Sequence, residues 1–126
     1  NFFVVDLPGY GFARAPQKVR DAWRPLIEGY LRKSDELLGV VQLIDARRDP
    51  TEDDLNMIEF LASIEMPTLI VLTKIDKLKP AEREKRVSTS ATLLGIDTEQ
   101  VIGFSSVTGE GRDHLLESIS HLLTGD

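Results

Sequence analysis

Four short apolar runs along the chain have the length and composition of buried strands. They span residues 2–5, 37–44, 68–72 and 101–104, and each is rich in Val, Ile, Leu or Phe. Runs of this kind, without strict alternation of apolar and polar positions, are typical of parallel strands that are covered on both faces. The pattern therefore predicts four parallel strands.

A stretch with helical periodicity follows each of these runs. The four stretches span residues 15–34, 51–64, 80–94 and 111–123. Thr51 and the acidic residues after it suit the start of a helix, and Gly95 suits the end of the third stretch. The first stretch keeps helical spacing, although Pro25 and Gly29 are expected to bend it.

Strand and helix alternate four times, which predicts the α/β class with a parallel sheet between layers of helices. In such folds the binding residues lie in the loops that follow the carboxyl ends of the strands. The chain has 126 residues, of which 41% are hydrophobic, enough for one compact core. We therefore expect residues 1–126 to form one domain or most of one.

Composition and charge narrow the possible functions. The chain has no cysteine, which excludes a disulfide framework and a thiolate metal site. The net charge is −6, but residues 1–33 carry a balance of +3 and the remainder −9. Any RNA contact should therefore use the first third, unless this charge belongs to an ordinary solvated helix face. No apolar run approaches the ~20 residues that span a bilayer, so we expect a soluble, cytoplasmic protein without membrane contact.

The loop after the first predicted strand reads Asp6-Leu7-Pro8-Gly9. A carboxylate at this point can lie near a phosphate-bound Mg²⁺, through a water ligand, and the glycine lets its backbone N–H approach a terminal phosphate. The same residues also form an ordinary turn, which explains them equally well in isolation.

The loop after the third predicted strand reads Thr73-Lys74-Ile75-Asp76. Guanine presents two adjacent donors, N1–H and the exocyclic amine, and the carboxylate of Asp76 can accept from both. Adenine lacks this pair, so the aspartate would select against it. In this interpretation the stem of Lys74 covers the base and the hydroxyl of Thr73 tethers neighbouring loops; the alternative is a solvated loop that leads into a helix.

The last predicted strand ends in Phe104-Ser105-Ser106. A backbone N–H of this turn would reach the guanine O6, and the Ser105 hydroxyl would brace the Asp76 loop. A Ser-Ser turn is not specific evidence for a nucleotide site by itself. It supports this interpretation because it lies one helix beyond Asp76 in the sequence.

Together these motifs resemble those of the EngB (YihA/YsxC) family of bacterial GTPases, within the TrmE-Era-EngA-EngB-like class. The similarity extends over the whole chain and is carried by residues 6–13, 43–47, 53–54, 73–77 and 104–106, together with Trp23 and Tyr30. The resemblance implies a P-loop NTPase (Rossmann-like) three-layer αβα fold that binds GTP or GDP with Mg²⁺. It also implies slow GTP hydrolysis and a role in large ribosomal subunit assembly and cell division.

The resemblance further implies that the 126 residues are the C-terminal part of one G domain. No glycine in the chain is followed by lysine, so the phosphate-binding Gly-x-x-x-x-Gly-Lys-Ser/Thr loop is absent, as is the switch threonine segment. The chain alone is therefore expected to bind nucleotide weakly and to contribute no catalytic residue. Tyr10 stands where Ras-like enzymes carry a water-orienting glutamine, which implies slow turnover in the full-length parent.

Family members also place a strand between those predicted at 2–5 and 37–44. Without it, two strand edges lack partners. We expect that these strands pair directly, that a second chain fills the gap as a dimer or by strand exchange, or that preceding chain supplies the strand.

Two other classes of function remain open. Asp6, Asp45 and Lys74 at strand ends would suit the phospho-acceptor pocket of a receiver domain, although that interpretation gives Asp76 no role. A non-enzymatic fragment that packs against a partner is compatible with the missing phosphate loop.

Overall fold

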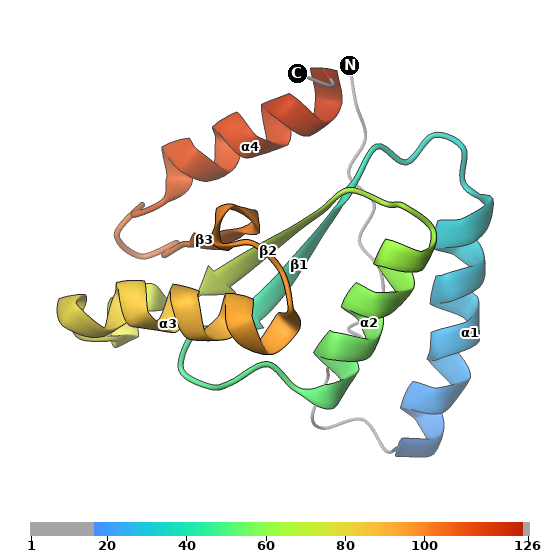
Figure 1. The fold of residues 1–126 in the computed structure, drawn as a ribbon, viewed down its shortest axis with the longest axis horizontal. Helices are drawn as coiled ribbons and strands as arrows, with labels where there is room; N and C mark the ends of the chain where they lie inside the picture. The colour runs from blue at the N-terminus through green and yellow to red at the C-terminus, as the bar shows by residue number, and fades with distance from the viewer. Residues whose placement is uncertain (1–16, 125–126) are drawn as a thin grey trace.

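The computed structural model describes residues 17–124, apart from the side chains of Gln17, Val19, Arg20 and Trp23. Its elements are α1 (Gln17–Lys33), β1 (Val40–Asp45), α2 (Glu52–Ser63), β2 (Thr68–Thr73), the short 3₁₀ turn η1 (Ile75–Lys77), α3 (Pro80–Leu94), the 3₁₀ turn η2 (Thr98–Gln100), β3 (Val101–Gly103) and α4 (Arg112–Thr124) (Figure 1). The strand predicted at 2–5 lies outside the described residues.

The three described strands form one parallel sheet in the order β1-β2-β3. Val40 pairs with Thr68 and Asp45 with Thr73, so β1 and β2 end level with each other. The α/β class with a parallel sheet is confirmed. The predicted start of β1 at residue 37 was wrong, because β2 begins only at Thr68 and residues before Val40 have no partner strand there.

Helices cover both faces of the sheet, as the predicted three-layer arrangement requires. On one face α2 and α3 pack against the strands through a core that includes Ile44, Ile58, Ile70, Leu72, Ala91, Leu94 and Val101. Side chains alternate along a strand, so buried Val71 and Ile102 belong to the opposite face, where α4 lies (Figure 1). The Leu122 side chain of α4 approaches Gly39 at the start of β1.

The helix α1 packs against α2 at the side of the sheet. Ile27 and Leu31 of α1 meet Met57 and Leu61 of α2, and all four are buried. The helix runs from Gln17 to Lys33 with Pro25 inside it. Among the described residues, no helix combines the length and apolarity needed to cross a bilayer.

The outer edge of β1 has no partner strand within residues 17–124. Val41 and Leu43 of this strand are 40% and 65% exposed, a large fraction for apolar residues of a sheet. The predicted strand at 2–5 is not described, so the three ways of satisfying this edge remain predictions.

Capping fixes the ends of the central helices. The Thr51 hydroxyl accepts from the Asp54 N–H at 3.2 Å, and the Asp54 carboxylate accepts from the Thr51 N–H at 2.9 Å. Gly95 ends α3 with φ of 70°, which only glycine adopts without cost. Both helix-end predictions are confirmed.

Replacing Thr51 with alanine should lower the free energy of unfolding by about 1 kcal/mol, because the Asp54 N–H loses its acceptor. Urea denaturation of the 126-residue chain measures this. Thr92→Ala is the control, since the Thr92 hydroxyl only donates to Ser88 O within α3. Equal stability of the two variants would contradict the assigned cap.

Candidate functional site

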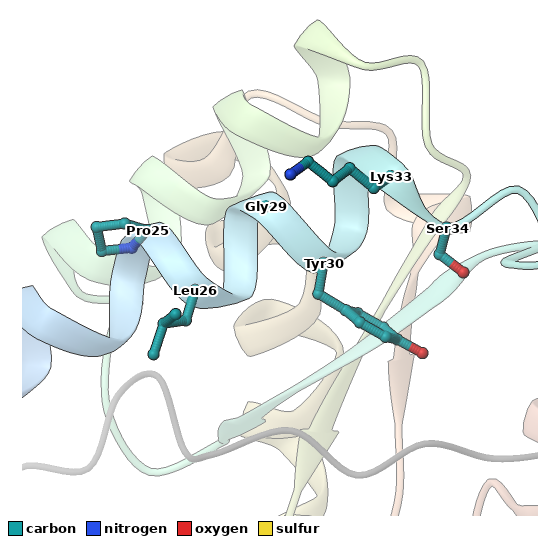
Figure 2. Close-up of a pocket in the computed structure, with 6 residues that line it drawn as sticks. All are labelled: Pro25, Leu26, Gly29, Tyr30, Lys33 and Ser34. Carbon is teal, nitrogen blue, oxygen red and sulfur yellow. The ribbon is translucent and has the colours of Figure 1, made fainter.

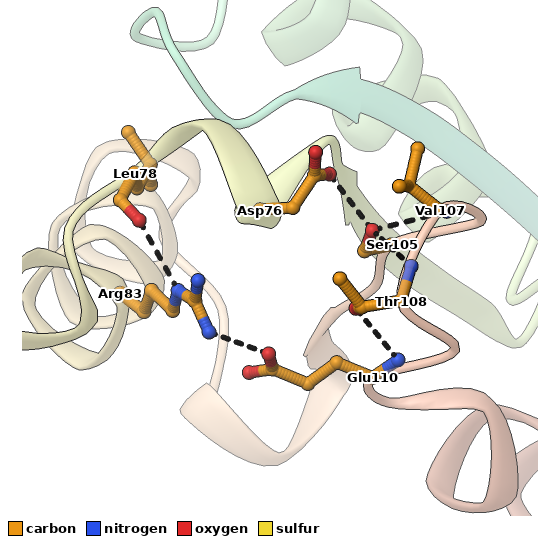
Figure 3. Close-up of polar contacts among 7 residues, drawn as sticks. All are labelled: Asp76, Leu78, Arg83, Ser105, Val107, Thr108 and Glu110. Carbon is orange, nitrogen blue, oxygen red and sulfur yellow. Dashed lines mark hydrogen bonds and ion pairs between the residues drawn. The ribbon is translucent and has the colours of Figure 1, made fainter.

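The loops after β2 and β3 meet through one side-chain hydrogen bond. The Ser105 hydroxyl donates to Asp76 Oδ1 at 2.8 Å (Figure 3). The same oxygen accepts from the backbone N–H groups of Val107 and Thr108, both at 3.2 Å. Ser105 is fully buried, so these contacts satisfy a hydroxyl that solvent does not reach. The contact expected from the sequence between Ser105 and the Asp76 loop is present.

Ile75, the residue before Asp76, anchors the Asp76 loop to the core. Ile75 is 4% exposed and belongs to the core under the sheet, and its N–H donates to Phe104 O at 3.3 Å. Lys74 takes a left-handed backbone conformation, with φ of 61°, just before this residue. The sharp turn places Ile75 inside while Asp76 stays half-exposed.

Among the polar groups of these loops that have no hydrogen-bond partner within the described residues, two matter for ligand binding. One is Asp76 Oδ2, because Ser105 engages only Oδ1. The other is the backbone N–H of Ser106, an exposed residue in the turn. An unpaired acceptor and an unpaired donor on adjoining loops are what a heterocycle with both kinds of group would require.

Thr73 and Lys74 connect the same region to the end of β1. The Thr73 hydroxyl donates to Ile44 O at 3.4 Å, and Lys74 Nζ lies 3.5 Å from Asp45 Oδ2. The predicted tether through Thr73 is therefore present, whereas contact of Lys74 with a base remains a prediction.

Asp45 is held by Arg47. The guanidinium donates to both carboxylate oxygens, at 3.0 and 2.7 Å, and the Arg47 backbone N–H donates to Oδ1 at 2.9 Å. The side-chain hydrogen bonds from Arg47 hold the pKa of the Asp45 carboxyl well below its ordinary range, with smaller help from the charge of Lys74. Both oxygens being engaged, Asp45 is poorly suited to accept a phosphoryl group.

Two glycines shape the turn that carries Ser105. Gly109 and Gly111 have φ of 80° and 82°. A Cβ on Gly111 would lie 1.9 Å from Gly103 O, whereas one on Gly109 would meet nothing within 4 Å. Gly111 is thus required by close backbone contact. The Gly-x-Gly spacing in the sequence is typical of a turn but gives no sign of this close packing.

A hollow along α1 is separate from these loops. Figure 2 shows its lining: Pro25, Leu26, Gly29, Tyr30, Lys33 and Ser34. It contains none of the residues predicted to bind nucleotide, and we do not assign the site to it.

The phosphate and metal part of the predicted site is not described. Asp6, Leu7, Pro8 and Gly9 lie outside residues 17–124, as does Tyr10. Within that range, no group of three or more His, Cys, Asp or Glu side chains could hold a metal ion. The role of Asp6 toward Mg²⁺ stays a prediction.

The chain is similar to proteins named probable GTP-binding protein EngB. That of Gemmatimonas aurantiaca is 52% identical over 123 residues, which cover 98% of this chain and 60% of that protein. That of Halothermothrix orenii is 44% identical over 125 residues, covering 98% and 63%. The chain thus spans about three-fifths of the length of these curated relatives. No model of a protein family matches it.

Solved structures share the fold at low sequence identity. A crystal structure of a probable GTP-binding protein engB superposes with a TM-score of 0.82 at 19% identity, over 96% of this chain and 77% of that one. The FeoB G-domain of Methanococcus jannaschii gives 0.62 at 24% identity, over 95% and 70%. Era in complex with MgGDPNP and nucleotides 1506-1542 of 16S ribosomal RNA gives 0.63 at 21%, over 90% and 37%. The fold is therefore that of P-loop GTPase G domains.

Replacing Gly111 with alanine should destabilise the chain by about 2–4 kcal/mol, because the clash with Gly103 O adds to the cost of a left-handed backbone. Gly109→Ala is the matched control, since it shares the positive φ but has open space around Cβ. Urea unfolding compares the two. If Gly111→Ala cost no more than Gly109→Ala, the close contact with Gly103 would be wrong.

Replacing Asp45 with asparagine should lower stability at pH 7 by about 1 kcal/mol, since Arg47 loses a charged acceptor. The pKa of Asp45 is lower in the folded chain than in the unfolded chain. Its contribution is therefore complete above the unfolded pKa of about 4 and is lost as the pH falls below it. The difference in free energy of unfolding between wild type and variant should therefore shrink steadily as the pH is lowered from 5 to 2, which urea unfolding curves measured across this range would show.

Proposed function

We propose that this chain, which is similar to proteins named probable GTP-binding protein EngB over about three-fifths of their length, belongs to the EngB family and forms the guanine-recognising part of a GTP- and GDP-binding domain. One observation carries this proposal. Ser105 holds one oxygen of Asp76 while the other has no partner among the described residues, at the carboxyl ends of parallel strands where such folds bind ligands.

The donor pattern of guanine fits these loops. Asp76 accepts from N1–H and the exocyclic amine, and the Ser106 N–H donates to O6. Phe104 and Ile75 hold the two loops together through their backbone hydrogen bond, and Thr73 ties them to β1. Lys74 covers the base with its stem. Adenine would leave the Asp76 acceptor and the Ser106 donor unmatched, which is a strong basis for discrimination.

Phosphate binding involves residues outside the two base-recognising loops. We propose that Asp6 contacts Mg²⁺ through water and that Gly9 approaches the terminal phosphate, with Leu7 and Pro8 shaping the turn. Bound Mg²⁺ would offset phosphate charge. The 126 residues contain no Gly-Lys pair for a phosphate loop, so on their own they should bind nucleotide weakly and hydrolyse none measurably.

For the whole protein we propose slow GTP hydrolysis in the cytoplasm and a role in assembling the large ribosomal subunit, with effects on cell division. The similar curated proteins are named GTP-binding, which supports the nucleotide part of this proposal. Lys18, Arg32 and Lys33 are exposed along α1 and offer positive charge to such a partner. Closure of the β1 edge by a second chain remains an alternative to closure by further residues of the same chain.

Guanine selectivity can be tested on the 126-residue chain by ¹⁵N NMR titration, which detects weak binding. GDP should shift the amide signals of residues 74–76 and 105–107, whereas ADP should not. Asp76→Asn should weaken GDP binding by about tenfold or more. It should improve binding of xanthosine diphosphate, because asparagine can donate to the carbonyl that replaces the guanine amine.

The control is Asp113→Asn on the exposed surface of α4, which should titrate like wild type. Equal responses to GDP and ADP would refute guanine recognition. Shifts confined to other loops would show that nucleotide binds elsewhere. A chain that responds to neither nucleotide, even when extended by the sequence encoded upstream, would favour the non-enzymatic fragment.

A further inference from the structure

Arg83 on α3 contacts both loops of the proposed base site, although it belongs to neither motif. Its Nε donates to Leu78 O at 3.3 Å, at the end of the turn that begins with Ile75 and Asp76. Its Nη1 donates to Glu110 Oε1 at 2.5 Å, across 27 positions of sequence. Figure 3 shows the guanidinium between the two loops.

Glu110, the partner of Arg83, is also hydrogen-bonded to Ser105 through its backbone. The Glu110 carbonyl accepts from the Ser105 N–H at 3.0 Å, and the Glu110 N–H donates to Thr108 Oγ1 at 3.2 Å. The Ser105 hydroxyl then donates to Asp76. From Asp76 two residues of backbone lead to Leu78, and hydrogen bonds then run through Arg83 and Glu110 to Ser105 and back to Asp76, so that a closed ring forms. Figure 3 draws these hydrogen bonds except the one between the Ser105 N–H and the Glu110 carbonyl.

The ion pair in this ring is poorly placed to serve stability. The Glu110 side chain is 46% exposed and that of Arg83 25% exposed. Exposed pairs of this kind contribute little to the free energy of folding. What the pair does is geometric, because the planar guanidinium serves two acceptors on separate loops at a fixed mutual angle.

We infer that Arg83 and Glu110 are positioning residues for base recognition, which hold the Asp76 and Ser105 loops at the separation that a guanine ring requires. This inference rests on the proposed function. Neither side chain need touch the nucleotide. Both act by fixing the orientation of the Asp76 carboxylate and of the Ser106 N–H before the base arrives, so that less ordering is needed on binding.

The chain offers a matched control on the same helix. Arg86 Nη1 donates to Asp49 Oδ1 at 2.5 Å, and the Arg86 side chain is also 25% exposed. This pair joins α3 to the loop after β1 and makes no contact with the ring. Arg83→Gln and Arg86→Gln therefore each remove one positive charge and one ion pair of the same type. Only Arg83→Gln also breaks the ring.

The experiment measures GDP and ADP binding to wild type, Arg83→Gln, Arg83→Lys, Glu110→Gln and Arg86→Gln by NMR titration. Arg83→Gln and Glu110→Gln should each weaken GDP binding about three- to tenfold and leave ADP binding unchanged. Arg83→Lys should fall between them and wild type, and Arg86→Gln should match wild type within about twofold. The Tm values of all variants should agree within about 3 °C.

A second readout needs no nucleotide. Val107 and Thr108 N–H both donate to the Ser105 hydroxyl, so their amide signals report the ring directly. They should move in Arg83→Gln and stay in place in Arg86→Gln.

The outcomes separate the inference from the function on which it rests. If wild type prefers GDP and both Arg83→Gln and Glu110→Gln bind GDP as wild type does, the positioning role of the ring is contradicted. Guanine recognition itself would then still stand. If Arg83→Gln fails to fold, Glu110→Gln decides, since it retains the backbone carbonyl that Ser105 uses. If wild type shows no preference for GDP, the proposed function fails and this inference fails with it.

Discussion

The buried hydroxyl of Ser105 is the contact on which the site depends. It donates one hydrogen bond to Asp76 and accepts two from the turn that follows it. A fully buried hydroxyl needs hydrogen-bond partners within the protein, because water cannot supply them. If Asp76 or the turn moved away, the Ser105 hydroxyl would be buried without its partners, which costs free energy. One side chain therefore fixes the position of the carboxylate and the shape of the loop that supplies backbone donors. The remaining local structure has to be compatible with both the position of the Asp76 carboxylate and the shape of this loop.

Strained backbone positions around this hydroxyl are held by ordinary core packing. Lys74 adopts a left-handed conformation that costs a non-glycine residue free energy. Ile75, which follows it, is almost completely buried among residues of the sheet and α3, and this burial offsets the cost. At Gly111 the constraint is steric, because the backbone passes too close to Gly103 for any side chain. Rigid supports beneath exposed groups are the arrangement expected of a preorganised binding site.

Under the proposed function, the described residues would supply selectivity more than affinity. Hydrogen bonds to a base edge distinguish one ring from another, since a mismatched group is left unpaired on desolvation. Phosphates bring most of the charge of a nucleotide, and backbone N–H groups, lysine and Mg²⁺ are the groups that bind it. We propose that the lysine and most of these N–H groups belong to the part of the relatives that this chain does not span, and that Asp6 and Gly9 of this chain complete the phosphate site. Within residues 17–124 the outer edge of β1 has no partner strand and Val41 and Leu43 are exposed, so we propose that such a part packs there.

The sequence alone determined the class of fold, the sites of the capped helix ends and the residue types at strand ends. These features depend on local geometry: apolar runs and helical periodicity set the elements, and Thr51 and Gly95 set helix ends. Neighbouring residues determine them, so they can be predicted from the sequence. It also identified Asp76 and Ser105, because their motifs carry a chemical requirement. It missed Arg83, Glu110 and the packing reason for Gly111. The Arg83–Glu110 contact joins positions 27 apart, which come together only because β2 and β3 pair in parallel. The contact of Gly111 with Gly103 depends on how the turn between them folds back on the strand, which the residue types alone do not specify. The start of β1 was likewise decided by where β2 begins, since a strand exists only where a partner accepts its hydrogen bonds.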